Sequence, residues 1–334
     1  MQARNAGPAG ARDRIAPGIA LGSPRKTREV RNQFMDSTIW NDFRFRPDDV
    51  IIASYAKAGT TWTQQIVGQL IFGGRPDVDV AALSPWVDFR LPSAAEKLAA
   101  LEAQRHRRFL KTHLPVDALV FSPQARYIYV GRDDRDIAWS FYHHHASGNE
   151  EFYRTINDTP GRVGARILPP TGSIRGYFLD WLYGDGYPIW SLWENVASWW
   201  AIRHLPNVLL LHYADLKADL PRAVRRIADF LGVAPDPATF EAVLHHSTFE
   251  HMKANAGLSA PRGGLHFKGG ARTFFHSGTN GRWRSTLTAD DCRLYEAIAN
   301  RHLGPACARW LAEGEAGQAR VSAEAKRYRC EIVE

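Results

Sequence analysis

Four short apolar runs alternate along the chain with segments of helical periodicity, and this alternation limits the possible folds more than any other feature. The runs with β-branched or large apolar side chains are residues 50–54, 108–111, 127–130 and 208–212. Apolar residues recur with helical spacing in segments 61–72, 137–145 and 221–231. Strands that alternate with helices form mostly parallel sheets with both faces covered. The sequence therefore predicts an α/β three-layer sandwich with a mostly parallel central sheet.

The length of 334 residues and the hydrophobic content of 45% indicate an ordinary globular chain. Because single cores stop growing at roughly 250–300 residues, we expect one domain at residues 35–312, a disordered N-terminal extension at 1–34 and a C-terminal tail at 313–334. Seven basic and two acidic side chains in residues 1–31 contribute +5 of the net charge of +7. The body is thus nearly neutral, and we expect no nucleic-acid partner.

Three features indicate a cytoplasmic protein. The cysteines Cys292, Cys307 and Cys330 lack Cys-x-x-Cys spacing, which fits a reducing compartment. The longest apolar runs are far shorter than the roughly 20 residues that cross a bilayer. The N-terminal segment lacks the compact apolar stretch of a secretory signal. We therefore expect no membrane span.

The first predicted strand ends in the segment Tyr55-Ala-Lys-Ala-Gly-Thr-Thr-Trp62, which then opens a helix. A strand, tight loop and helix start together aim backbone N–H groups and the positive helix terminus at one point, as in many phosphate sites. Lys57 adds a charge and Gly59 permits close approach of the backbone. The other interpretation is an ordinary helix start capped by threonine. The lysine precedes the glycine, unlike the Walker order, so a metal-dependent NTPase is disfavoured.

Five blocks in this order resemble those of cytosolic-type sulfotransferases, which use 3′-phosphoadenosine 5′-phosphosulfate (PAPS). The family's first block reads Tyr-Pro-Lys-Ser-Gly-Thr-Thr-Trp. The matching segments here are 55–62, Lys111-Thr-His-Leu-Pro115, 127–142, 212–217 and 246–252. The likeness covers roughly residues 35–312 and suggests a bacterial aryl-sulfotransferase-like member. It implies a P-loop-like nucleotide-binding core.

The resemblance implies a set of donor-binding residues. PAPS, or its product 3′-phosphoadenosine 5′-phosphate (PAP), would contact Lys57, Ala58, Gly59, Thr60, Thr61, Trp62, Arg132, Ser140, Tyr213, Ser247, Phe249, His276, Ser277 and Gly278. For Arg132, a surface salt bridge with Asp133, Asp134 or Asp136 is the alternative. The family has Arg-Lys where this chain has His276 and Ser277. Weaker donor binding, or compensation by Arg272, Arg282 or Arg284, would follow.

The resemblance also assigns the chemistry. His113 matches the family's general base, and an imidazole that titrates near neutrality suits removal of an acceptor proton. Lys57 and Lys111 are candidates to stabilise charge on the departing phosphate. For His113 the alternative is a buried histidine bonded to a backbone carbonyl. The motif set requires no metal.

The acceptor site is implied by Trp86, Phe89, His113 and Tyr142, which match family positions that line an acceptor pocket. They suggest a small hydroxyl acceptor that is aromatic or apolar. The motifs do not identify this acceptor. Two other functions remain open, a non-catalytic nucleotide-binding protein and a nucleotide kinase.

The histidine groups, the family's dimer motif and the turn-rich segments remain to be interpreted. Two groups of histidines lack standard zinc-ligand spacing, so we expect no metal site. One group is 143–145, and the other consists of His245, His246 and His251. The family's dimer motif loses its terminal glutamate at Arg293, which leaves the oligomeric state open. Segments 147–188 and 255–275 are rich in turn residues and read as long loops, and 177–200 reads as a lid or as core helix.

Overall fold

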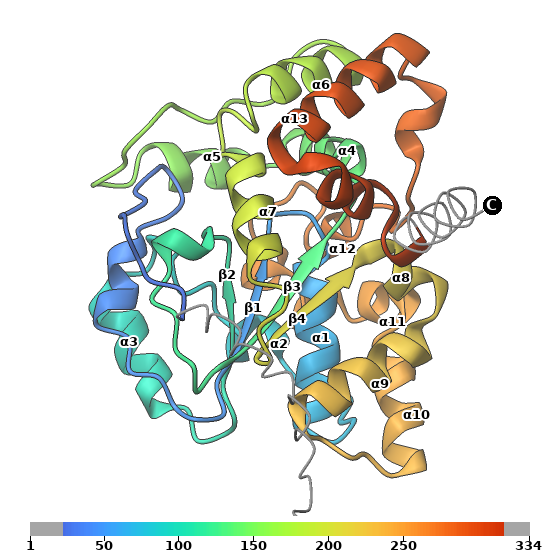
Figure 1. Cartoon of the computed structure of the whole chain (residues 1–334). Helices are drawn as coiled ribbons and strands as arrows, with labels where there is room; N and C mark the ends of the chain where they lie inside the picture. Colours follow the sequence, from blue (N-terminus) through green and yellow to red (C-terminus); the bar gives the residue numbers. More distant parts are fainter. Residues whose placement is uncertain (1–22, 317–334) are drawn as a thin grey trace, which may run out of the picture.

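The computed structural model describes residues 23–316, and a four-stranded parallel sheet lies at its centre (Figure 1). The strands are β1 (Val50–Ser54), β2 (Phe109–Thr112), β3 (Arg126–Gly131) and β4 (Val208–His212), in the order β2-β1-β3-β4. Val50 lies opposite Phe109 on one side and Arg126 on the other. Each of the four predicted strands is present, and the predicted parallel sheet is confirmed.

Helices connect and cover these strands. The longer ones are α1 (Thr60–Ile71), α3 (Ala94–Ala103), α4 (Asp134–Ala146), α6 (Ile174–Tyr183), α7 (Leu192–Ala201), α9 (Leu220–Leu231), α10 (Pro237–His246) and α13 (Ala289–Glu313). The shorter ones are α2 (Val80–Leu83), α5 (Glu150–Asn157), α8 (Tyr213–Ala218), α11 (Phe249–Ala254) and α12 (Ala271–Phe274). The 3-10 turns are η1 (Ser37–Asn41), η2 (Val116–Ala118), η3 (Ala256–Leu258), η4 (Pro261–Gly264) and η5 (Arg282–Ser285).

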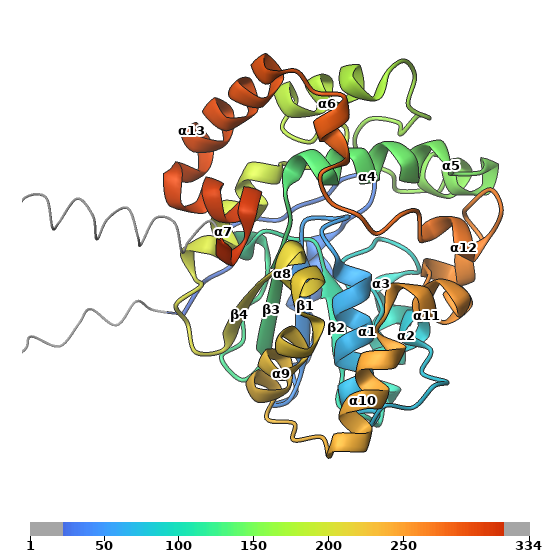
Figure 2. The ribbon, with the colours of Figure 1, turned by 90° about the vertical axis from the view of Figure 1, so that its right-hand side faces the viewer.

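Alternate residues of each strand enter two different cores. Val50 and Ile52 of β1 pack with α1, α9 and α10, whereas Ile51 and Ala53 pack with α4, α6, α7 and α13. This two-residue period is the geometric rule for a strand. Figure 2 shows α1 and α10 beside the sheet and α4 crossing above it. The sheet is therefore covered on both faces, which makes the three layers that the sequence predicted.

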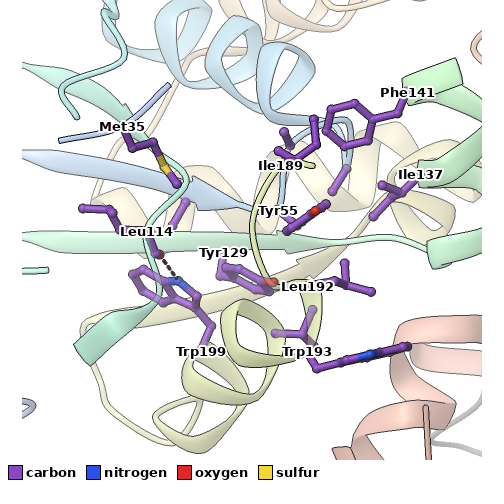
Figure 3. Packing of buried hydrophobic residues seen from close by; sticks show 14 of the residues in the cluster. Met35, Tyr55, Leu114, Tyr129, Ile137, Phe141, Ile189, Leu192, Trp193 and Trp199 are labelled. Carbon is purple, nitrogen blue, oxygen red and sulfur yellow. Dashed lines mark hydrogen bonds between the residues drawn. The ribbon is translucent and has the colours of Figure 1, made fainter. Parts of the chain in front are cut away.

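Aromatic side chains fill the second of these cores (Figure 3). Tyr129 of β3 stacks on Trp199 of α7 with ring centroids 5.4 Å apart. The indole nitrogen of Trp199 donates to the carbonyl oxygen of Leu114 at 3.0 Å, so this buried donor is satisfied. The Leu114 bond attaches α7 to the segment just after β2, and that segment carries residues of the functional site.

The turn-rich segments contain more helix than the sequence suggested. The expected loop at 147–188 holds α5 and α6, and that at 255–275 holds η3, η4 and α12, so the expectation of long loops there is wrong. In α5 the buried side chains of Phe152 and Ile156 lie four residues apart and form an apolar face. Trp193 and Trp199 are buried, which makes part of 177–200 a core helix rather than a lid.

The predicted extension at 1–34 falls partly outside the described residues, as does most of the predicted tail. Residues 23–34 contact the domain: Arg28 pairs with Asp117 at 2.8 Å and with Glu194 at 2.7 Å, and Phe34 is buried. This described part is therefore attached rather than disordered. Among residues 23–316, no helix combines the length and the apolar character that a bilayer crossing needs.

A buried ion pair at the start of β1 supports a stability prediction. Arg108 donates to both carboxylate oxygens of Asp49, at 2.8 and 2.6 Å, and both side chains are fully buried. Asp49→Ala leaves the buried guanidinium with only the half-exposed Glu102 carboxylate, 3.3 Å from Arg108 Nη1, as counter-ion. We expect a loss of about 3–5 kcal/mol in the free energy of unfolding in urea. The control is Asp77→Ala, which breaks the exposed Arg75 pair and should leave the midpoint unchanged. Equal effects of the two changes would contradict the prediction.

Candidate functional site

A cavity of about 610 Å³ lies where the four strands end, and residues that follow each strand line it. Those residues are Lys57 after β1, His113 after β2, Arg132 after β3 and Tyr213 after β4. Binding sites in open parallel sheets form at this carboxyl edge. Most of the predicted site residues line the same cavity: Lys57, Gly59, Thr60, Thr61, Trp62, Trp86, Phe89, Lys111, His113, Arg132, Ser140, Tyr213, Phe249, His276, Ser277 and Gly278.

The loop between β1 and α1 adopts a conformation that exposes a helix N-terminus. Gly59 caps α1 with φ of 115°, and no side chain accepts from the first turn, which also contains no acidic residue. A Cβ on Gly59 would come within 2.8 Å of the Tyr213 ring. Lys57 also has positive φ, 70°, a costly conformation for a residue with a side chain. The capped-helix alternative is therefore wrong, and the N–H groups at this end remain available for an anion.

Two buried lysines place positive charge in the cavity. Lys57 Nζ donates to His144 Nδ1 at 3.1 Å and lies 4.7 Å from the centre of the Phe274 ring. Burial, and then the nearby Lys111 and Arg132, lower the pKa of Lys57 to about 7. Burial lowers the pKa of Lys111 to about 8. Within residues 23–316 neither ammonium forms an ion pair, so an anionic ligand would supply the missing countercharge.

His113 is held in the form that can accept a proton. Its Nδ1 lies 2.7 Å from the carbonyl oxygen of Ser54, which only accepts, so Nδ1 carries the hydrogen and Nε2 keeps a free lone pair. The ring packs edge-on against Trp86, with centroids 4.7 Å apart, and is nearly parallel to Trp190. Burial and the neighbouring Lys111 hold the pKa of His113 well below its usual range. The imidazole is therefore neutral at pH 7.

Arg132 makes no salt bridge with its acidic neighbours. Its Nη1 donates to the carbonyl oxygen of Lys57 at 3.1 Å and its Nη2 to that of Thr279 at 3.0 Å. Asp133 pairs instead with Arg135, at 2.9 Å. The alternative of an Arg132 salt bridge is thus wrong. Its Nε is buried and has no hydrogen-bond partner in the described part of the chain, which leaves a donor for a ligand.

Arg282 occupies the region where the family's two cations are replaced. Its Nη1 donates to His276 Nδ1 at 3.1 Å and its Nη2 to His143 Nε2 at 2.9 Å, and the two imidazoles stack at 4.3 Å. Of the three arginines considered as compensation, Arg282 lines the cavity, and Arg272 and Arg284 do not. Its charge therefore lies beside His276 and Ser277.

Three predicted site residues do not line the cavity. The prediction that Tyr142 lines the acceptor pocket is wrong: its hydroxyl donates to the Gly172 carbonyl oxygen at 3.1 Å, and its ring packs on Tyr177 of α6 instead. Ala58 is buried in the turn behind the loop. Ser247 is fully buried; its carbonyl oxygen accepts from the Trp62 indole at 2.7 Å, and its hydroxyl has no partner.

Sequence reasoning missed several lining residues, notably His143, His144, Trp190 and Phe274. Helical spacing offered a signal for two of them, since His143 and His144 follow Ser140 by three and four residues and share its face of α4. No local pattern marks Trp190 or Phe274, which tertiary folding brings to the cavity.

Comparisons with known proteins agree with this geometry. A family model described as a sulfotransferase domain matches residues 47–305. A glycolipid sulfotransferase of Mycobacterium bovis is 34% identical over 319 residues, covering 88% of this chain and 97% of the relative. Sulfotransferase 1A1 of Rattus norvegicus is 28% identical over 265 residues, covering 77% of this chain and 84% of the relative.

Solved structures share the fold. A retinol dehydratase in complex with retinol and PAP aligns with a TM-score of 0.63 and 25% identity, covering 80% of this chain and 84% of that one. A mouse sulfotransferase complexed with PAP aligns with a TM-score of 0.62 and 22% identity, covering 86% of this chain and 92% of that one.

The lowered pKa of Lys57 leads to a prediction about anion binding. An anion such as PAP stabilises the charged ammonium and so raises the pKa of Lys57 above its free value of about 7. Below pH 7 the free lysine is already charged. Above pH 7 binding must take up a proton, so we expect PAP affinity to fall by up to about tenfold per pH unit. Calorimetry in buffers of different ionisation enthalpy measures the proton uptake.

The matched control for this prediction is Lys57→Met. It should weaken PAP binding at pH 6.5 and flatten the fall just above pH 7, below the pKa of about 8 at which Lys111 loses its own charge. The same slope in both proteins would contradict the assignment to Lys57.

Proposed function

Because the chain belongs to the sulfotransferase family, we propose that it transfers the sulfuryl group of PAPS to a hydroxyl of a small, apolar or aromatic acceptor, with His113 as general base. One observation carries the proposal: a neutral imidazole with a free Nε2 shares a cavity with two buried lysines that form no ion pair with any residue of 23–316. A base for the acceptor and countercharge for a departing phosphate are the two requirements of sulfuryl transfer.

In the proposed reaction, the acceptor oxygen forms a bond to sulfur while the bond between sulfur and the 5′-phosphate oxygen breaks. The acceptor proton passes to His113 Nε2. The carbonyl oxygen of Ser54 accepts from Nδ1 at 2.7 Å and stabilises the imidazolium that results. Negative charge grows on the departing phosphate, where the Lys57 ammonium and the N–H groups at the start of α1 would offset it. This offset is larger in the transition state than in the ground state, which is the condition for catalysis.

We assign the donor nucleotide to the half of the cavity lined by Trp62, Tyr213 and Phe249. The Trp62 and Tyr213 rings meet edge to face with centroids 5.4 Å apart, and Arg132 lies 4.2 Å over Tyr213. The unpaired Nε of Arg132 and the nearby Arg282 would hold the 3′-phosphate, since a guanidinium matches phosphate geometry. Arg282 would then supply the positive charge that the family's cations at positions 276 and 277 provide.

We assign the acceptor to the apolar half. Trp86 and Phe89 stack with ring centroids 5.0 Å apart, and the ring centroids of Trp190 and Trp86 are 6.2 Å apart. Lys111 Nζ lies 4.9 Å over the Trp86 ring, between the aromatic wall and the charged half. These contacts support an acceptor with one hydroxyl at the His113 end and an apolar body. The glycolipid sulfotransferase named above and the retinol-bound dehydratase favour lipid-like alcohols within this class.

A labelled-donor screen against phenols, steroids, lipids and free glycans tests the acceptor class. We expect sulfated products from apolar or amphiphilic alcohols and none from free hydrophilic sugars. Products confined to the sugars would contradict the apolar acceptor. Tight PAP binding with no product across the panel would favour the non-catalytic alternative, and magnesium-dependent ATP turnover would favour the kinase.

The role of His113 gives a second prediction. His113→Gln keeps a donor for the Ser54 carbonyl but has no basic nitrogen, so we expect kcat to fall about 10²–10⁴-fold. PAP affinity should change less than threefold, because the nucleotide half of the cavity is untouched. Steady-state sulfation assays and calorimetry with PAP measure the two effects. Turnover within a factor of three of the unmodified enzyme would remove His113 as the base.

A further inference from the structure

Three imidazoles meet where α10 ends and α11 begins, outside the lining of the cavity. They belong to His245, His246 and His251, and their potential ligand nitrogens all lie within 4.8 Å of one another. The ring centroids are 5.3 Å apart for His245 and His246, 5.0 Å for His245 and His251, and 4.6 Å for His246 and His251. The sequence spacing gave no sign of this cluster, because the turn through Ser247 and Thr248 is what returns His251 to the other two.

The size of this triangle fits a tetrahedral metal centre. With Zn–N bonds of about 2.0–2.1 Å and tetrahedral angles, three ligated imidazoles have ring centroids about 5 Å apart. The three observed separations lie close to this value. The ligand nitrogens, which lie within 4.8 Å of one another, would have to approach to about 3.4 Å by side-chain rotation to bind a common ion.

A buried amide orients one of the rings. Gln69 Nε2 donates to the carbonyl oxygen of Arg75 at 2.9 Å, which turns Gln69 Oε1 toward His246 Nδ1 at 3.2 Å. Because Oε1 only accepts, Nδ1 carries the hydrogen, and Nε2 is the deprotonated nitrogen that an ion would bind. The ring also lies within hydrogen-bond reach of the Gly74 backbone. Metal-bound histidines usually have such a partner on the second ring nitrogen, and it fixes both tautomer and orientation.

The other two rings are accessible to an ion. His245 is exposed and His251 is half-buried. His251 Nε2 accepts a long bond from Asn255 Nδ2 at 3.3 Å, and the same amide also donates to the His251 carbonyl oxygen at 3.0 Å. Asn255 therefore retains a partner if the ring turns toward an ion. The exposed side of the cluster leaves the fourth position to water.

We propose that His245, His246 and His251 bind a transition-metal ion of the zinc class, with water as the fourth ligand. The site is structural, since none of the three residues lines the cavity. It lies next to the segment that supports the nucleotide half: the His246 carbonyl oxygen accepts from Gln65 Nε2 at 3.1 Å, and that of Ser247 accepts from Trp62. A bound ion would fix the junction of α10 and α11 that carries Ser247.

The test uses the tag-free full chain, treated with a chelator, and titrated with Zn²⁺ by calorimetry and with Co²⁺ by visible absorption. We expect one equivalent of Zn²⁺ to bind, tetrahedral ligand-field bands from Co²⁺, and a rise in Tm with the ion present. His245→Ala and His251→Ala should each weaken Zn²⁺ binding at least tenfold. Gln69→Leu should weaken it less, through loss of ring orientation. The control His204→Ala removes an exposed histidine elsewhere and should have no effect.

Two results would overturn the proposal: no Zn²⁺ binding to the unmodified chain, or binding that is equally tight in His245→Ala. The exposed position of His245 means that its loss should not impair folding, so this variant decides the matter even if His251→Ala is unstable. None of these measurements needs sulfotransferase activity. Failure of the metal site is therefore distinguishable from failure of the proposed function.

Discussion

The site depends on positive charge that the fold buries without a countercharge. Lys57, Lys111 and Arg132 share one cavity, and within the described part of the chain none of them forms an ion pair with a carboxylate. Burying an unpaired charge is costly, and this cost lowers the pKa values of Lys57 and Lys111 to about 7 and about 8. The cavity is thus prepared for a ligand that carries several negative charges. The parallel sheet makes this possible, because all strands end at the same edge: Lys57 follows β1, Arg132 follows β3, and Lys111 lies near the carboxyl end of β2.

The strands were predictable because each is short, buried and bounded by polar residues, so composition alone marks it. The helix predicted at 137–145 begins three residues too late and ends one too early, since Asp133 caps α4 through the Arg135 amide and the first turn is polar. Helices α5 and α6 were missed because glycine and proline surround them. Their stability comes from packing, as with the Trp181 ring against Tyr55, rather than from a strong local pattern.

Prediction of the site succeeded where one continuous segment carries the chemistry and failed where tertiary structure assembles it. The segments 55–62 and 111–115 each bring several residues to the cavity through a single turn. Tyr142 was misplaced because a motif match does not state which face of a helix a residue occupies. His144 is the opposite case, since it was set aside as part of a histidine run and yet accepts from Lys57.

Burial lowers the pKa of His113 as well as those of the two lysines, so the imidazole and the ammonium groups are electrostatically coupled. Lys111 and Lys57 repel a proton on His113 and help to hold its pKa low, so the imidazole alone is neutral but only weakly basic. A bound anionic donor offsets the lysine charges, and this offset raises the pKa of His113 toward its ordinary value. Under the proposed function, the ring would then be a stronger base when the sulfuryl donor is bound. In the proposed reaction, electrostatic coupling across the cavity would therefore link donor binding to activation of the acceptor hydroxyl.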